Sequence, residues 1–171
     1  VVTRASEQAG VLAGALRGLG AQVEELAAVE ILTAPDYGPL DAALSVLGDY
    51  DWLIFTSVNG VRFVEQRLGR MGRALMDFRG RVAVIGPATR QAVESLGLPV
   101  NLTPAEYVAE SLLQAFAAVD LRGRRILLPR AALARDVLPS GLAAAGARVD
   151  VVEAYRVEAP PGLAREARRL F

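Results

Sequence analysis

The chain has 171 residues, of which 53% are apolar and 22% are charged, and its formal net charge is zero. This balance excludes a disordered chain and removes the electrostatic argument for a nucleic-acid or membrane-surface partner. The sequence has no cysteine, no histidine and, among its 19 basic residues, no lysine, which excludes disulfides, thiol and imidazole chemistry and lysine Schiff bases.

The first part of the chain alternates between extended and helical patterns. Residues 1–4 resemble the end of a strand, and residues 6–19 have the pattern of a helix with Ser6 as its N-cap. Residues 22–32 are predicted to be extended. A cluster of glycine and proline at 33–39 then favours a crossing between domains.

The rest of the chain repeats the order of strand and helix. Apolar runs predict strands at residues 52–56, 81–85, 100–102, 125–128 and 148–157. The helices predicted between and after them cover residues 40–47, 58–70, 87–96, 109–119 and 137–145, and another begins at 163. In the last strand, the alternation predicts that Val149, Val151 and Ala154 face one way. Strand–helix alternation with short turns predicts βαβ units and a mostly parallel sheet.

Two clusters of helix- and strand-breaking residues, at 33–39 and 159–162, bracket a block of about 120 residues, the size of a flavodoxin-like unit. We therefore predict a complete second domain over residues 33–151. Residues 1–32 and 152–171 would form part of a first, discontinuous domain. The alternative, in which the flanking segments extend one larger sheet, stays open.

Ligands of open parallel sheets bind beyond the carboxyl ends of the strands. Four predicted strands end there in small or polar residues, and the helix N-termini that follow attract anions. We therefore predict a cleft for an acidic ligand. The substrate-binding candidates are Arg4, Thr56, Ser57, Gly86, Thr89 and Arg130.

Each candidate also has a structural explanation. Ser57 or Asn59 caps the following helix, Thr89 bonds to its own backbone, and Gly86 supplies the backbone angles of its turn. The structural explanation for Tyr155, on the last strand, is that it is a half-buried packing residue. The structural explanation for the arginines is that they are surface cations. A nucleotide site is not expected, because no G-x-x-x-x-G-K-[ST] or G-x-G-x-x-G spacing occurs.

Six motifs, taken in chain order, resemble the uroporphyrinogen-III synthase family. They are Val-Thr-Arg at 2–4, Asp-Trp-Leu-Ile-Phe-Thr-Ser at 51–57, Val-Ile-Gly-Pro-Ala-Thr at 84–89, Ala-Glu-Ser-Leu-Leu at 109–113, Ile-Leu-Leu-Pro-Arg at 126–130 and Val-Val-Glu-Ala-Tyr-Arg at 151–156. The resemblance implies two flavodoxin-like α/β domains with parallel sheets, joined by a two-stranded ladder at residues 22–32 and 148–157. It also implies that the first domain is incomplete in this chain.

The resemblance further implies that the protein cyclises hydroxymethylbilane, a small-molecule polycarboxylate, and inverts its last pyrrole ring to give uroporphyrinogen III. The family uses no metal or organic cofactor. Tyr155 matches the family's tyrosine near the hinge and would be catalytic, assisting loss of the hydroxyl, while Ser57 and Thr89 would hold carboxylates of the substrate.

We expect a cytoplasmic monomer without a membrane or nucleic-acid partner, since no apolar run is long enough to span a bilayer and no signal peptide is recognisable. Two alternatives remain. The first is an α/β domain that binds an anion or small ligand without turnover. The second is a synthase segment fused to another tetrapyrrole enzyme, such as a methyltransferase.

Overall fold

The computed structural model describes residues 1–170, except for the side chains of residues 6–8. The chain divides into two compact units, the first made of Val1–Thr33 and Arg156–Phe171 and the second of Ala34–Tyr155. Among the described residues, no helix is both long and apolar enough to cross a membrane.

The first unit contains α1 (Ser6–Gly18), β1 (Glu30–Thr33) and α7 (Leu163–Leu170). Val2 forms a parallel bridge with Glu25. Within the stretch predicted to be extended, residues 22–32, strand pairing is limited to this bridge and to β1. Ala5 occupies the N-cap position of α1, and the prediction that Ser6 does so is wrong. The side chain of Ser6 lies outside the described residues.

The second unit follows the predicted order of strands and helices. It contains α2 (Gly38–Ser45), β2 (Trp52–Phe55), α3 (Val58–Arg70), β3 (Arg81–Val84), α4 (Pro87–Ser95), α5 (Ala109–Phe116), β4 (Arg125–Ala131), α6 (Val137–Ala144) and the start of β5 (Arg148–Glu158). The sheet has the order β1-β5-β4-β2-β3, and β2, β3, β4 and β5 pair in parallel. The predicted α/β class is therefore confirmed. The strand predicted at 100–102 is reduced to a single bridge between Leu102 and Ala83.

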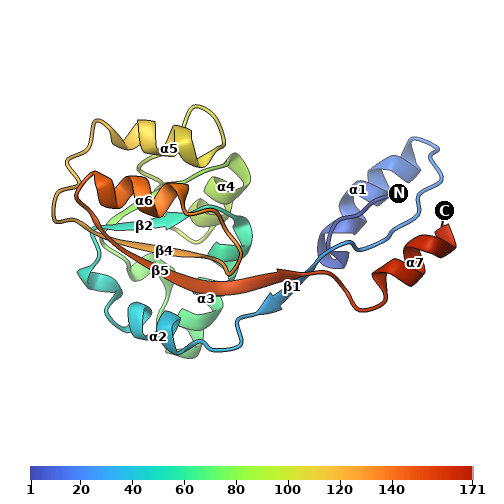
Figure 1. Ribbon diagram of the computed structural model, residues 1–171, viewed down its shortest axis with the longest axis horizontal. Coiled ribbons are helices and arrows are strands. Elements are labelled where there is room, and N and C mark those ends of the chain that lie inside the picture. The colour runs from blue at the N-terminus through green and yellow to red at the C-terminus, as the bar shows by residue number, and fades with distance from the viewer. Residues whose placement is uncertain (171) are drawn as a thin grey trace. The chain divides into compact units, whose positions relative to one another are not determined.

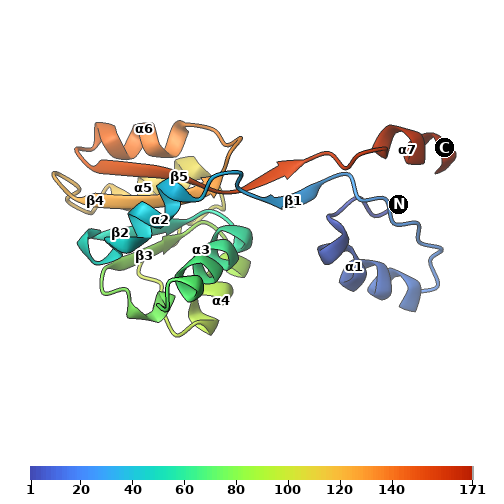
Figure 2. The ribbon, with the colours of Figure 1, turned by 90° about the horizontal axis from the view of Figure 1, so that it is seen from below.

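Helices cover both faces of the sheet of the second unit. Helices α5 and α6 lie on one face, and α3 and α4 lie on the other (Figures 1 and 2). Trp52 and Ile54 belong to the apolar cluster beneath α5 and α6, and Leu53 and Phe55 point to the opposite face because side chains alternate along a strand. All four are buried, which explains the continuous apolar run of β2.

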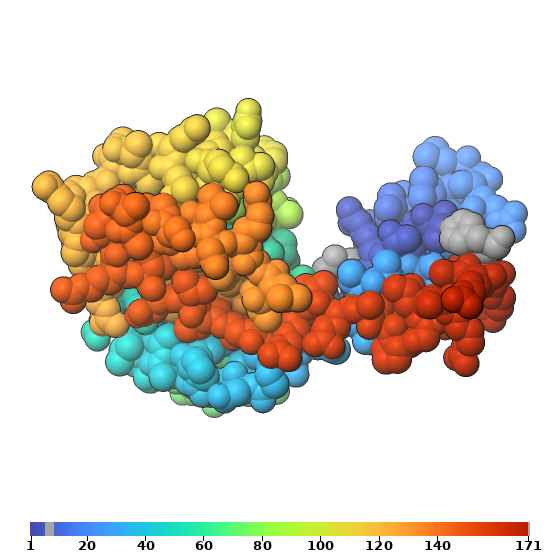
Figure 3. All heavy atoms as spheres, in the orientation of Figure 1, coloured from blue at the N-terminus to red at the C-terminus, as the bar shows by residue number. Residues whose placement is uncertain are grey.

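The predicted facing of β5 is wrong. Val151 is 40% exposed, whereas Val152 and Ala154 are buried. Val152 and Ala154 occupy the same face, opposite to Val151, because side chains alternate in this part of the strand. Figure 3 shows part of β5 as a band that α6 and α2 leave uncovered, in keeping with the exposure of Val151.

The amino ends of three strands are joined by Asp51. Its carboxylate accepts the backbone N–H of Arg125 at 2.9 Å and a guanidinium N–H of Arg124 at 2.8 Å, and its carbonyl accepts the N–H of Arg81 at 2.8 Å. The hydrogen bond from the Arg125 backbone, supported by Arg124, holds the pKa of Asp51 below its ordinary value. Asp51 therefore stabilises the fold in its ionised form.

We expect Asp51→Ala to lower the free energy of unfolding by about 1 to 2 kcal/mol at neutral pH, since solvent partly screens this carboxylate. A lowered pKa in the folded state means that the stabilisation is present above about pH 4 and is lost as the pH falls through the lowered value. Urea unfolding of variant and wild type should therefore differ at pH 7 and converge in acid.

Asp120→Ala is the control, because Asp120 and its partner Arg122 are both largely exposed. That change should leave the urea midpoint where it is. Equal losses in the two variants would show that Asp51 does not join the strands in the way described.

Candidate functional site

Parallel β2, β3, β4 and β5 end at the same edge of the sheet, with Phe55 of β2 paired to Val84 of β3. This carboxyl edge of the second unit carries most of the predicted site residues. They are Thr56 and Ser57 after β2, Gly86 and Thr89 after β3, Arg130 near the end of β4, and Tyr155 of β5. Arg4 is an exposed residue of the first unit and is described only within that unit.

Ser57 and Tyr155 are in direct contact. Ser57 is the N-cap of α3, and its Oγ accepts the backbone N–H of Gly60 at 3.1 Å. The same Oγ lies 2.8 Å from the Tyr155 hydroxyl, and either oxygen can be the donor. Ser57 is thus a helix cap, as one sequence explanation holds, and also the hydrogen-bond partner of the predicted catalytic tyrosine.

A β-bulge sets the direction of Tyr155. Arg130 pairs with Glu153 and the next residue of β4, Ala131, pairs with Tyr155, so Ala154 is an extra residue in β5. Without the bulge, Tyr155 would alternate onto the face that Glu153 occupies. With it, both Ala154 and Tyr155 are buried.

The ring of Tyr155 lies on Phe63 of α3. The two ring centroids are 5.6 Å apart and the planes are inclined by 8°. Sequence reasoning missed Phe63, because its spacing on α3 marks it only as one of several residues of the buried helix face. The bulge that brings Tyr155 to it leaves no signal in the sequence.

The turn after β3 leaves room in front of a helix. Gly86 is the N-cap of α4 with φ −126° and ψ 162°, an extended conformation that any residue adopts. A Cβ added there would meet nothing within 4 Å. The explanation that Gly86 supplies special backbone angles is therefore wrong. No side chain caps α4, so the first N–H groups of the helix, beginning at Ala88 because Pro87 has none, lack intrahelical partners.

The polar groups beside this turn differ in burial. Thr89, in the first turn of α4, is 4% exposed, and Thr56 is partly buried. Arg130 donates to the carbonyl of Arg135 at 2.9 Å and lies 2.6 Å from the carboxylate of Asp136. Arg130 therefore holds the loop between β4 and α6, and its contact with a ligand stays a prediction.

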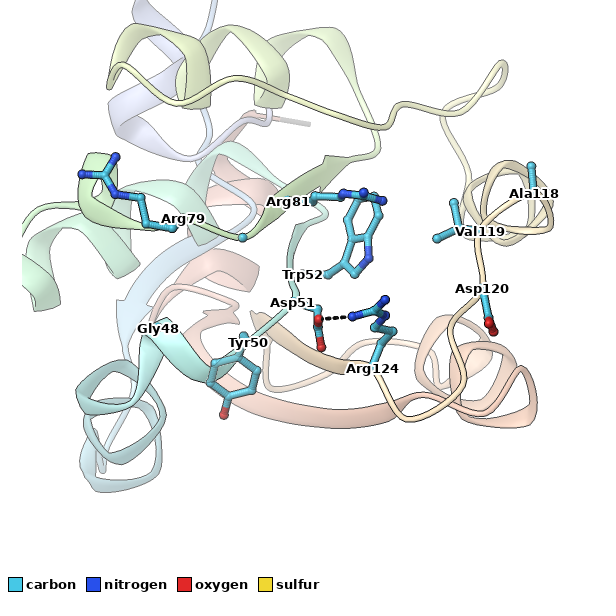
Figure 4. A pocket seen from close by; sticks show the side chains of 11 residues that line it. Gly48, Tyr50, Asp51, Trp52, Arg79, Arg81, Ala118, Val119, Asp120 and Arg124 are labelled. Carbon is cyan, nitrogen blue, oxygen red and sulfur yellow. Dashed lines mark hydrogen bonds and ion pairs between the residues drawn. The ribbon is translucent and has the colours of Figure 1, made fainter.

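The opposite, amino edge of the sheet has a hollow of about 570 Å³ lined by Tyr50, Asp51, Trp52, Arg81 and Arg124, among others (Figure 4). Two of its cationic groups are engaged within the protein, since Arg124 pairs with Asp51 at 2.8 Å and the Arg81 guanidinium lies 5.6 Å from the centre of the Trp52 ring. The third, Arg79, points away from the other lining side chains (Figure 4). Burial, together with a hydrogen bond to Asp150, raises the pKa of the neighbouring Tyr50 to about 12. Most of the predicted site residues lie at the carboxyl edge, and we take that edge as the candidate site.

In the part of the chain that the structure describes, no three acidic side chains are grouped so that they could hold a metal ion. The candidate site instead offers two helix N-termini, hydroxyl groups and one arginine. These groups bind anions and transfer protons.

The fold and this edge define an α/β protein of the kind that holds ligands beyond the carboxyl ends of parallel strands. Residues 10–171 match the family described as uroporphyrinogen-III synthase HemD, and the chain belongs to that family. The predicted family is confirmed.

Curated relatives agree with this assignment. The chain is 34% identical over 168 residues to a uroporphyrinogen-III synthase of Synechococcus elongatus, covering 98% of this chain and 63% of that protein. It is 31% identical over 171 residues to a putative uroporphyrinogen-III synthase of Methanocaldococcus jannaschii, covering 99% of this chain and 66% of that protein. The chain thus spans less than two thirds of either relative.

A solved structure shows the same fold. A mutant uroporphyrinogen III synthase from the extremely thermophilic bacterium Thermus thermophilus aligns with a TM-score of 0.69 and 19% sequence identity, covering 94% of this chain and 63% of that chain. At this level of identity the likeness concerns the fold alone.

Proposed function

We propose that the protein is a lyase that converts hydroxymethylbilane into uroporphyrinogen III, closing the linear tetrapyrrole with inversion of its last ring. The hydrogen bond between Tyr155 and Ser57 at the N-terminus of α3 carries this proposal. The two hydroxyl groups supply a proton donor beside backbone N–H groups that can bind carboxylates. The chain belongs to the uroporphyrinogen-III synthase family, whose name describes this reaction.

The polar groups of the carboxyl edge match a substrate with many carboxylates. The open N-terminus of α4 at Gly86 and the N-terminus of α3 present backbone N–H groups and a partial positive charge. In the proposal, these groups hold carboxylates, assisted by Thr56, Ser57, Thr89 and Arg130. Arg4 lies in the first unit, and its contact with the substrate stays a prediction.

Tyr155 assists departure of the hydroxyl in this mechanism. The carbon–oxygen bond of the hydroxymethyl group breaks, its electron pair and a proton from the Tyr155–Ser57 pair go to the oxygen, and water leaves. The azafulvene cation that remains is attacked by the last ring through its substituted position. The spiro species reopens and closes in the inverted sense, and the proton lost on closure restores the pair. The protein mainly enforces geometry.

We further infer two flavodoxin-like domains joined by a two-stranded ladder, with residues 33–151 as the complete second domain. The division into units at Thr33 and Tyr155 supports this inference, as does the position of β1 beside β5. Residues 1–32 and 152–171 would then belong to a first, discontinuous domain. The monomeric state and the cytoplasmic location stay predictions.

The test is to incubate the full-length protein with freshly made hydroxymethylbilane and to separate the uroporphyrin isomers after oxidation. The proposal predicts an excess of isomer III. Isomer I alone, which forms spontaneously, would reject the synthase and leave the anion-binding alternative.

Gly86→Ala tests the turn after β3. A methyl group there meets no atom of the protein but occupies the space in front of α4, so we expect unchanged thermal stability and a KM raised about tenfold, the equivalent of one weakened hydrogen bond to a charged group. Steady-state kinetics measures this change. Gly48→Ala is the control, because a Cβ at Gly48 is also unobstructed and lies at the amino edge. A KM that is unaffected by Gly86→Ala would remove this turn from the site.

A further inference from the structure

Tyr155 is held at both ends of its side chain. Its hydroxyl is 2.8 Å from Ser57 Oγ, and its ring is stacked on Phe63, with centroids 5.6 Å apart and planes 8° from parallel. A hydrogen bond fixes the distance of the hydroxyl but leaves the phenol free to swing about that contact. The stacked ring fixes its plane, so the two restraints together fix the direction of the O–H bond.

The backbone beneath Tyr155 is also fixed. The bulge at Ala154 turns Tyr155 towards α3, and the Ala132 N–H donates to the Tyr155 carbonyl at 3.1 Å. Phe63 itself is only 6% exposed and lies on the buried face of α3. The ring that supports Tyr155 is therefore part of a packed helix, not a mobile surface group.

The hydrogen bonds at Ser57 show why direction matters. Ser57 Oγ already accepts the Gly60 N–H at 3.1 Å. The hydroxyls of Ser57 and Tyr155 have two protons between them, and one lies in the bond that joins them. The second proton is available to the leaving oxygen of a substrate, provided that the pair keeps its orientation.

We propose that Phe63 is a positioning residue of the reaction and acts through Tyr155, by holding the phenol in the plane from which the pair delivers its proton. This inference rests on the proposed function for its catalytic consequence. Its structural part, that Phe63 holds the Tyr155 ring, stands independently of turnover.

Phe63→Leu in the full-length protein tests the proposal. It keeps an apolar side chain but removes the stacked ring, and we expect kcat to fall about tenfold with little change in KM, as for a misdirected catalytic group. Phe116→Leu is the matched control: Phe116 is 3% exposed and contacts Trp52 in an edge-on aromatic pair remote from Tyr155. It should lose stability without loss of kcat. An equal fall in both variants would overturn the proposal.

A double variant distinguishes an effect of Phe63 on the orientation of Tyr155 from a general effect on the fold. In Tyr155→Phe protein the hydroxyl that Phe63 directs is gone, so adding Phe63→Leu should lower kcat no further. A repeated tenfold fall would show that Phe63 acts by another route.

A nuclear magnetic resonance measurement tests whether Phe63 holds the Tyr155 ring. The ring signals of Tyr155 are identified by their loss in Tyr155→Phe, and they should move in Phe63→Leu because a stacked neighbouring ring shifts them, but stay in place in Phe116→Leu. Unmoved signals in Phe63→Leu would overturn the proposal. If wild type makes only isomer I, the proposed function fails, whereas this measurement still decides whether Phe63 holds Tyr155.

Discussion

Tyr155→Phe should lower kcat for uroporphyrinogen III formation roughly 100-fold, the usual effect of removing a general acid. The variant keeps the ring that stacks on Phe63 and loses only the hydroxyl that bonds Ser57, so the fold should survive at a cost of about 1 kcal/mol. Initial rates measured with fresh hydroxymethylbilane, together with thermal unfolding, check both parts.

Tyr50→Phe is a close control for this variant. Tyr50 is 4% exposed, against 6% for Tyr155, and its hydroxyl bonds Asp150 at 2.7 Å, but it lies at the amino edge of the sheet. Its loss should cost similar stability and leave kcat unchanged. Wild-type turnover in Tyr155→Phe would remove Tyr155 from the mechanism.

Gly80→Ala should destabilise the second unit by about 3 kcal/mol, because it forces an atom into packed surroundings. A Cβ at this position would overlap Phe78 Cζ and would lie 2.7 Å from the carbonyl oxygen of Tyr50 and 2.8 Å from that of Asp51. The two carbonyls belong to the chain entering β2, so the clash cannot be relieved by turning a side chain.

Gly86→Ala controls for the general effect of removing a glycine beside β3. Gly80 precedes this strand and Gly86 follows it, and only Gly80 is crowded. Urea unfolding should therefore show a lower midpoint for Gly80→Ala and an unchanged one for Gly86→Ala. A shared shift of both midpoints would point to an effect on the unfolded chain instead.

The second unit could be predicted largely from its sequence, because both faces of its central strands are covered. The continuous apolar run of β2 and the proline at the first position of α4 are local signals, and the elements formed where these signals indicated. The first unit was less predictable. Residues 22–32 lack such a pattern, and among these residues only Glu25 in its bridge and the part of β1 from Glu30 on pair as strand structure.

The turns of the candidate site could be predicted from the sequence, but the contacts between its side chains could not. Ser57 and Gly86 follow strands that end at one edge, a consequence of parallel order that the sequence signals. The bond between Ser57 and Tyr155 joins residues 98 positions apart and depends on the bulge at Ala154. A bulge changes which face a side chain occupies, so alternation along β5 could not place Tyr155 against α3 and could not find Phe63.

The central claim is that the carboxyl edge of the second unit binds the tetrapyrrole, and amide shift mapping of the full-length protein with uroporphyrinogen III under anaerobic conditions tests it most directly. The account predicts changes at the amides of residues 57–60, 86 and 88–90 and in the ring signals of Tyr155. Changes confined to the opposite edge, at residues 48–52, 79–81 and 118–124, would contradict it.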